Sequence, residues 1–271
     1  MRWTYVPIAL ALAIFLAADA AGAETTVICP TSPVSSEASS TDKEQLKLLS
    51  NQATACVRER KPAQAVALLS EIIRRNPTDA AAYLNRGSAQ ATTGEVQLAL
   101  SDYSTALRLQ PDLVEAWYDR GTTLTHIRRY EQAIADFTEA IRLKPDFALA
   151  YCNRGLANFQ LGRYDDALGD YSHAIEQNAA LTYCHFNRGN LYLTLGEYQR
   201  AVDDLTQTLA AESNNAIALS RRGQAYEALG QLSQALDDFR EALELDPALE
   251  SAEEGFARIT AQQQRSEGNS K

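Results

Sequence analysis

The feature that most constrains the fold of this chain is a short motif that recurs at constant spacing. A polar residue, an arginine and a glycine occur in this order five times, at Asn85-Arg86-Gly87, Asp119-Arg120-Gly121, Asn153-Arg154-Gly155, Asn187-Arg188-Gly189 and Arg221-Arg222-Gly223. Successive glycines are separated by 34 residues each time. A period of 34 residues held over five copies predicts a stacked array of helical repeats rather than one globular enzyme domain.

Other positions of the 34-residue unit keep the same period. When the glycine is numbered position 8, position 20 is alanine in all five units, position 24 is aromatic or leucine, and position 32 is proline in three units. Positions 4, 8 and 11 fall on one face of a first helix, and positions 20, 24 and 27 fall on one face of a second helix. Small residues at 8 and 20 would let the two helices approach closely, and a proline at 32 would end the second helix. Glycine at position 15 in four units favours a left-handed turn after the first helix.

This pattern resembles the tetratricopeptide repeat, which has small residues at 8 and 20, an aromatic residue at 24 and proline at 32. A sixth, degraded copy lies one period before the others, with Leu49, Ala53, Ala65, Leu69 and Pro77 at the diagnostic positions. The resemblance implies an all-α fold, a right-handed superhelix (an α-solenoid) of helix-turn-helix repeats with a C-terminal capping helix. The expected segments are a signal peptide (1–23), a disordered leader rich in Ser, Thr and Pro (24–41), a degenerate repeat 1 (46–79), repeats 2 to 6 (80–113, 114–147, 148–181, 182–215 and 216–249), a capping helix (250–261) and a disordered tail (262–271).

The first 23 residues have the features of an export signal. The chain starts with Met1-Arg2, continues with an apolar stretch from Pro7 to Ala18, and offers a small-residue cleavage site at Ala21-Gly22-Ala23. The apolar stretch is too short for a membrane span. We therefore expect an exported protein, periplasmic or secreted, whose mature chain contains no membrane span. Its favoured start is Glu24, and Ala18-Asp19-Ala20 is a second, weaker cleavage site.

Composition and motifs argue against nucleic-acid binding and against catalysis. The net charge is -10 and the isoelectric point is near 4.9, which disfavours nucleic acid and anionic membrane surfaces as partners. The chain has only three histidines, His126, His173 and His185, and no phosphate-binding loop or dinucleotide motif. His185 occupies position 4, an aromatic position in other units, and is expected to fill the core. We expect no cofactor, no metal and no enzymatic activity.

Two charged positions are repeated in phase. Position 7 is arginine and position 23 is aspartate in repeats 2 to 6, and repeat 1 lacks both charges. The arginines could form a basic surface for acidic ligands, or each could pair with an aspartate and support the repeat. A feature present in five consecutive units is expected to stabilise the fold of each repeat. The two helices of a hairpin would also bring the side chains at positions 7 and 23 within hydrogen-bonding distance. We therefore expect an ion pair in each repeat.

The four cysteines suggest one possible bridge. Cys152 and Cys184 lie on the first helices of consecutive repeats, whose axes are expected about 8–10 Å apart, and we predict no disulfide there because a bridge needs Cα atoms closer than about 7 Å. Cys29 lies in the leader and Cys56 on the open face of repeat 1. Either the leader folds over this face and is held by a Cys29–Cys56 disulfide, or both thiols are unpaired, and both alternatives stay open.

The family resemblance also implies a binding groove. In tetratricopeptide repeats, residues of the first helices line a concave surface, chiefly through positions 2, 5, 9 and 12. Glu115 and Asp119 are one helical turn apart there and could receive a lysine or arginine of a partner. The candidate groove residues are Leu84, Asn85, Glu115, Tyr118, Asp119, Cys152, Asn153, Leu156, Phe159, Tyr183, Phe186, Asn187, Asn190, Leu193 and Arg221.

The best-known groove chemistry of the family, a clamp for a C-terminal carboxylate, is not expected here. Only Asn187 and Arg221 match its residue pattern, and both lysines are missing. We expect a non-enzymatic scaffold or adaptor of the bacterial envelope that binds a protein or peptide in the groove. The alternative is a periplasmic accessory subunit of a secretion or polysaccharide-export system.

Overall fold

The structure consists of helices joined by short turns. A computed structural model of the chain describes residues 28–30 and 42–268. These residues form thirteen helices and no strand: α1 (Asp42–Arg58), α2 (Pro62–Arg75), α3 (Ala80–Thr92), α4 (Val96–Leu109), α5 (Val114–His126), α6 (Tyr130–Leu143), α7 (Ala148–Gln160), α8 (Tyr164–Gln177), α9 (Thr182–Leu195), α10 (Tyr198–Ala211), α11 (Ala216–Ala228), α12 (Leu232–Leu245) and α13 (Glu250–Gly268). None of the described helices is long and apolar enough to cross a membrane. The predicted all-α helical-repeat solenoid is confirmed.

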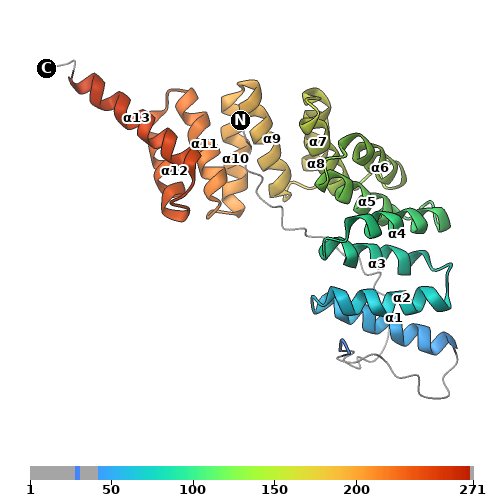
Figure 1. The fold of residues 1–271 in the computed structure, drawn as a ribbon. Helices are drawn as coiled ribbons and strands as arrows, with labels where there is room; N and C mark the ends of the chain where they lie inside the picture. The colour runs from blue at the N-terminus through green and yellow to red at the C-terminus, as the bar shows by residue number, and fades with distance from the viewer. Residues whose placement is uncertain (1–27, 31–41, 269–271) are drawn as a thin grey trace. The chain divides into compact units, whose positions relative to one another are not determined.

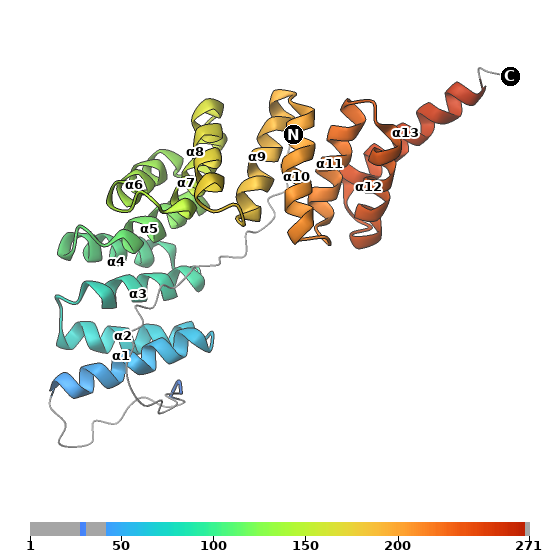
Figure 2. The same ribbon diagram turned by 180° about the vertical axis from the view of Figure 1, so that it is seen from behind.

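The helices form two compact units, one ending at Pro145 and the other beginning at Asp146. Within each unit, consecutive helices pack as hairpins that stack side by side (Figures 1 and 2). The first helices of neighbouring repeats also contact one another, α3 with α5 in the first unit and α7 with α9 and α9 with α11 in the second. These odd-numbered helices therefore form one layer in each unit, which we call the inner layer.

The repeated glycine and aromatic positions form the centre of each hairpin. A Cβ atom added to Gly121 would lie 2.8 Å from the ring of Phe137, closer than real side chains approach. Ala133 and Phe137 are both fully buried. The same contact joins position 8 to position 24 in repeats 2 to 6. The period found in the sequence therefore reflects a close approach between two helices that only glycine permits.

The turn between the two helices of a repeat uses a left-handed residue, as predicted. Gly94, Gly162, Gly196 and Gly230 have φ angles between 74° and 81°. In repeats 1 and 3 an arginine adopts the same conformation instead, with φ of 56° at Arg60 and 63° at Arg128. Arginine is strained in this region because of its Cβ atom, so the fold maintains the turn even without glycine.

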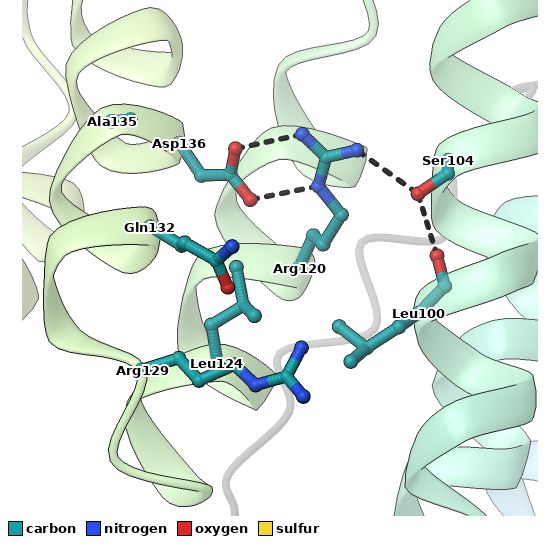
Figure 3. A pocket seen from close by; sticks show the side chains of 8 residues that line it. All are labelled: Leu100, Ser104, Arg120, Leu124, Arg129, Gln132, Ala135 and Asp136. Atoms are coloured by element: carbon teal, nitrogen blue, oxygen red, sulfur yellow. Dashed lines mark hydrogen bonds and ion pairs between the residues drawn. The ribbon is translucent and has the colours of Figure 1, made fainter.

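The predicted arginine–aspartate ion pairs are confirmed in all five repeats. Arg120 donates two hydrogen bonds to Asp136, from Nε to Oδ2 and from Nη2 to Oδ1, both at 2.8 Å (Figure 3). Equivalent pairs within one repeat join Arg86 to Asp102, Arg154 to Asp170, Arg188 to Asp204, and Arg222 to Asp238. In each pair the aspartate is buried and the arginine is about one-fifth exposed.

Each ion pair is extended by groups that the sequence analysis did not identify. Nη1 of Arg120 donates to the hydroxyl of Ser104, at position 25 of the preceding repeat, at 3.0 Å (Figure 3). Arg86, Arg188 and Arg222 donate in the same way to a serine or threonine of the repeat before. An aromatic ring also lies over every one of these guanidinium groups. The arginine thus joins its own hairpin internally and links it to the preceding one.

Both cysteine pairs form disulfides. Cys29 is bridged to Cys56, with Cα atoms 4.6 Å apart, and its backbone N–H donates to Glu59. The bridge between Cys152 and Cys184 contradicts our prediction, since their Cα atoms lie 5.7 Å apart. The prediction compared axis separations with Cα distances. Cα atoms stand about 2.3 Å from a helix axis, so facing residues come several Å closer than the axes do.

The ends of the array differ from the sequence-based boundaries. Helix α1 begins at Asp42, before the expected start of repeat 1 at residue 46, and Cys29, expected in a disordered leader, is buried against repeat 1. Helix α13 continues to Gly268, whereas we expected the capping helix to end at residue 261 and a tail to begin at 262. The polar residues after 261 continue the helix because no glycine or proline interrupts it before Gly268. The predicted signal peptide, the rest of the leader and residues 269–271 lie outside the described residues.

Helix α13 covers the end of the last repeat. Ala252 and Ile259 are fully buried, and Gly255 leaves room for the ring of Phe239, which would meet an added Cβ at 2.4 Å. Arg258 forms a two-point ion pair with Glu227 on α11. The helix therefore occupies the place that the first helix of a seventh repeat would take.

Removing the aspartate of one of these ion pairs should destabilise the fold. Replacing Asp136 with alanine leaves Arg120 half-buried without its carboxylate, and the free energy of unfolding should fall by about 3 kcal/mol. Asp112, an exposed aspartate in the loop before α5, provides a control whose replacement should change stability by less than about 0.5 kcal/mol. Urea denaturation followed by circular dichroism measures both. Equal, small effects would show that the pairs do not support the fold.

The bridge at the N-terminal end predicts a second effect. Because the Cys29–Cys56 disulfide joins residues 27 apart, the Cys29→Ser variant should unfold at lower denaturant concentration, with a loss of about 3 kcal/mol. Peptide mapping of the oxidised, unreduced protein should recover the Cys29–Cys56 and Cys152–Cys184 pairs. Free thiols at Cys29 and Cys56 in that sample would contradict the arrangement.

Candidate functional site

The candidate groove residues of the first unit lie on the inner layer, and most of them are buried. Leu84 and Tyr118 are 8% and 9% exposed, and the Tyr118 ring lies 5.9 Å from that of Phe137. Asp119 is 6% exposed, whereas Asn85 and Glu115 are half-buried. Leu84 and Tyr118 therefore pack in the core of the first unit rather than presenting apolar surface to a ligand.

Asp119 belongs to a buried polar network between repeats 2 and 3. The hydroxyl of Ser88 donates to Oδ2 of Asp119 at 2.8 Å, and the hydroxyl of Tyr103 donates to Ser88 at 3.4 Å. Burial raises the pKa of Asp119 to about 7, the bond from Ser88 opposes this, and the negative charge of Glu115 adds to it. Burial and the charge of Asp119 also raise the pKa of Tyr103.

The sequence offered a signal for this network that we did not use. Position 6 is asparagine in repeats 2, 4 and 5 but aspartate in repeat 3, and position 9 of repeat 2 is a serine. Position 6 of repeat 3, which is Asp119, lies near the Tyr103 ring of repeat 2. A buried carboxylate there needs a hydrogen-bond donor, and the hydroxyl of Ser88 is that donor. Since Ser88, Tyr103 and Asp119 are all buried, these perturbed groups form a structural junction that a substrate does not reach.

The candidate residues of the second unit are more accessible. Cys152, in its disulfide, and Leu156 are buried and unavailable to a ligand. The remaining apolar members are half-buried on α7 and α9: Phe159, Tyr183, Phe186 and Leu193. Phe159 and Tyr183 pack against the core around the Cys152–Cys184 bridge, and Phe186 and Leu193 pack against the core of repeats 5 and 6. The inner layer of this unit therefore carries a set of partly exposed aromatic and aliphatic side chains.

Two asparagines beside these residues have incomplete hydrogen bonding. Nδ2 of Asn187 and Oδ1 of Asn190 are buried and have no hydrogen-bond partner among the described residues. The two residues are three apart on α9 and lie on the same face of the helix. Asn158 on α7 differs, because its Nδ2 donates to Asp170 at 3.1 Å. A buried polar atom without a partner costs free energy, so the Asn187 and Asn190 amides are candidates for contacts to a ligand.

Cationic and amide groups continue this surface onto α11. Arg221 is half-buried, and Nη1 donates to Oε1 of Gln224 at 3.1 Å. Burial lowers the pKa of Arg221. Asn153, the remaining candidate, is half-buried on α7. Donor and acceptor groups thus alternate with apolar side chains along one layer, which suits an extended polypeptide with polar backbone and apolar side chains.

Within the described residues, no group of three or more histidine, cysteine and acidic side chains is placed to hold a metal ion. His185 is buried, and its Nδ1 lies 2.8 Å from Oδ1 of Asp204, the carboxylate that also binds Arg188. Its interpretation as a core residue agrees with this position.

Comparison with known families and structures supports the interpretation as helical repeats. Profiles described as "Tetratricopeptide repeat" and "TPR repeat" match residues 51–114, 129–162, 148–179, 182–215 and 216–249. A solved structure of MamA protein is 26% identical, with a TM-score of 0.57, over 62% of this chain and 92% of that one. A comparison with curated proteins found no match.

Two further structures share the fold at lower identity. YrrB, described as a TPR protein with an unusual peptide-binding site, is 23% identical with a TM-score of 0.58, over 68% of this chain and 95% of that one. PilF of Pseudomonas aeruginosa is 19% identical with a TM-score of 0.72, over 80% of this chain and 98% of that one. At these identities the likeness concerns the fold.

The buried carboxyl of Asp119 predicts a dependence of stability on pH. Its folded pKa, about 7, lies above the ordinary 3.8, so the folded state binds the proton more tightly than the unfolded state. Stability should therefore fall as pH rises from about 4 to 7 and then level off. The Asp119→Asn variant keeps an acceptor for Ser88 and removes the charge, so at pH 8 it should be more stable than the wild type, by on the order of 4 kcal/mol. Denaturant titrations at pH 5 and pH 8 measure this.

The half-buried Glu115 provides the control for this experiment. Its replacement by glutamine should leave most of the pH dependence in place, because Asp119 still carries the buried charge. Equal stability of the Asp119→Asn variant and the wild type at pH 8 would contradict the assignment.

Proposed function

The chain belongs to the tetratricopeptide-repeat family, and we propose that it is a non-enzymatic scaffold that binds a protein or peptide on the inner layer of its second unit. The fold is typical of protein–protein interaction. The proposed binding surface consists of the half-buried side chains of α7, α9 and α11: Asn153, Phe159, Tyr183, Phe186, Asn187, Asn190, Leu193 and Arg221.

The observation that carries this proposal is the incomplete hydrogen bonding of Asn187 and Asn190. Buried polar atoms without a partner also occur at Gln52, Gln90 and Tyr171, whereas at Asn187 and Asn190 two of them lie three residues apart on one helix face beside half-buried apolar side chains. The two atoms are buried in the structure, so each side chain must rotate to meet a ligand; a peptide backbone then offers the missing C=O acceptor for Asn187 Nδ2 and N–H donor for Asn190 Oδ1. The half-buried Phe186 and Leu193 lie on the same helix and provide apolar contacts beside these amides.

The structure changes the choice of anchor residues. Tyr118, a candidate from the sequence, packs against Phe137 in the first unit, and its removal would damage that core. Phe186 is half-buried and retains accessible surface. Aromatic side chains of this kind commonly dominate binding energies in interfaces. We therefore assign the main apolar anchor to Phe186.

We further propose that the protein works outside the cytoplasm, in the bacterial envelope. The signal-like segment at residues 1–23 and the cysteine pairs Cys29–Cys56 and Cys152–Cys184 support this proposal, because disulfides persist in oxidising compartments. Expression of the full chain and cell fractionation test it. Recovery of a processed, oxidised chain outside the cytoplasm is expected, and a full-length, reduced chain in the cytoplasm would contradict it.

Removal of the two amides separates binding from stability. In the Asn187→Ala, Asn190→Ala double variant, no hydrogen bond to the described residues is lost, so the free energy of unfolding should change by less than about 1 kcal/mol. Binding of partners captured from an envelope extract should fall at least about tenfold, since two polar contacts are removed. Denaturation and quantitative affinity capture measure the two effects.

Asn158→Ala is the matched control. It removes an amide on the same layer whose hydrogen bond to Asp170 is made within the fold. This variant should lose about 1–2 kcal/mol of stability and keep its partners. If the double variant captures the same proteins as the wild type, the inner layer of the second unit is not the binding surface.

A further inference from the structure

A cavity in the first unit lies apart from the inner-layer residues discussed above. It has a volume of about 400 Å³ and lies between α4, α5 and α6 (Figure 3). Leu100, Leu124 and Ala135 form apolar walls, and the guanidinium group of Arg120, held by Asp136 and Ser104, forms a polar one. The remaining lining residues are Arg129 and Gln132.

The other repeats indicate what such a cavity accommodates. Leu124 occupies position 11 of repeat 3, where repeats 5 and 6 have Tyr192 and Tyr226. The Tyr192 ring lies 5.9 Å from the guanidinium of Arg188, at position 7, and 5.6 Å from that of Arg200, at position 19. The Tyr226 ring lies 5.8 Å from the equivalent arginine of repeat 6, Arg222.

In repeat 3 the residues at positions 7 and 19 are Arg120 and Gln132, and both line the cavity. In repeat 5 the Tyr192 ring lies 5.9 Å and 5.6 Å from the groups at these two positions, whereas repeats 2, 3 and 4 have Gln90, Leu124 and Asn158 in place of that ring. Trp117 lies over the Arg120 guanidinium at 4.9 Å, so this arginine already contacts one ring in its own repeat. In repeats 2 to 4 the ring over this arginine comes from position 4 and in repeats 5 and 6 from position 11, so a ring that entered the cavity would be a second one at Arg120.

The turn beside the cavity is basic in a chain of net charge -10. His126, Arg128 and Arg129 are exposed there, and none of the three side chains forms an ion pair with a residue in the described part of the chain. Glu131 is the acidic residue of the same turn region, and it too is exposed. Arg128 occupies the left-handed position that is glycine in four repeats, so the turn carries a cation where glycine would be unstrained.

We propose that this cavity is a second docking site, which takes an aromatic side chain from an acidic segment of a partner protein. The ring enters between Arg120 and Gln132 and contacts Leu100, Leu124 and the guanidinium of Arg120. Carboxylates that flank the ring lie against Arg129 and the basic turn. The site is within the first unit and does not depend on the proposed function of the second unit.

The test uses the whole protein with leucine methyl groups labelled for NMR. The probe is an acetylated, amidated pentapeptide with one phenylalanine between two pairs of glutamates, titrated to about 1 mM, a range suited to weak binding. We expect the Leu100 methyl signals to shift with this peptide. They should shift much less with a peptide that has alanine in place of phenylalanine, or lysines in place of the glutamates.

Two variants locate the response. Leu124→Tyr places in repeat 3 the residue of repeats 5 and 6, fills the cavity from within, and should abolish the Leu100 shift while the helical circular dichroism signal is retained. Arg129→Glu changes an exposed side chain and should weaken binding of the acidic peptide by about fivefold. Leu98→Tyr is the matched control, because Leu98 is 55% exposed on α4 and does not line the cavity.

The outcomes separate this site from the inner layer. The Asn187→Ala, Asn190→Ala variant should bind the peptide as the wild type does. The proposal is overturned if the peptide leaves Leu100 unshifted, if the alanine peptide acts equally, or if Arg129→Glu binds the acidic peptide as tightly as the wild type. An unchanged response in a folded Leu124→Tyr variant would overturn it as well.

Discussion

The close approach of the two helices in each hairpin is the constraint on which the remaining structure depends. A glycine at position 8 lets the backbone of the first helix lie against the side chain at position 24 of the second, as Gly121 does against Phe137. This contact sets the separation at which the arginine one residue earlier reaches the aspartate one residue before the ring. The two-point geometry of the Arg120–Asp136 pair requires that separation and orientation. Packing and charge pairing therefore fix the same hairpin geometry, and both are repeated with the period of the sequence.

How far the sequence alone predicts this molecule depends on whether a feature is periodic. The repeat helices, the left-handed glycines and the pairing of positions 7 and 23 could all be predicted. Each occurs in several repeats, so the role of a residue could be inferred by comparing the repeats with one another. Features that occur once were harder. The Cys152–Cys184 bridge depends on which faces of α7 and α9 are in contact. The periodic pattern does not predict that contact, because the cysteines are not at repeated positions. The end of α13 depends on the absence of a helix-breaking residue, and we placed it too early because the sequence becomes polar there.

The candidate binding residues show the same limit. Family positions indicated which residues belong to the inner layer, but not how deeply each is buried. Leu84 and Tyr118 proved to be core residues, whereas Phe186 keeps accessible surface, although all three are large apolar residues on first helices. The difference arises from the side chains of the neighbouring repeats, which vary outside the repeated positions. The cavity at Leu124 is a related case, because it lies at a position whose residue differs from repeat to repeat.

The two ends of the described array are closed by different kinds of bond, and this gives the molecule a direction of unravelling. In a linear array each repeat is stabilised by its neighbours, so the terminal units open first. At the N-terminal end, Cys29 is joined covalently to Cys56, and opening of α1 does not release the segment that covers it. At the C-terminal end, α13 is held by buried side chains such as Ile259 and by the exposed Arg258–Glu227 pair, which open reversibly. Local opening should therefore start at α13 and proceed toward lower residue numbers. A protease that engages the C-terminal end would meet a far lower barrier than one that engages the N-terminal end.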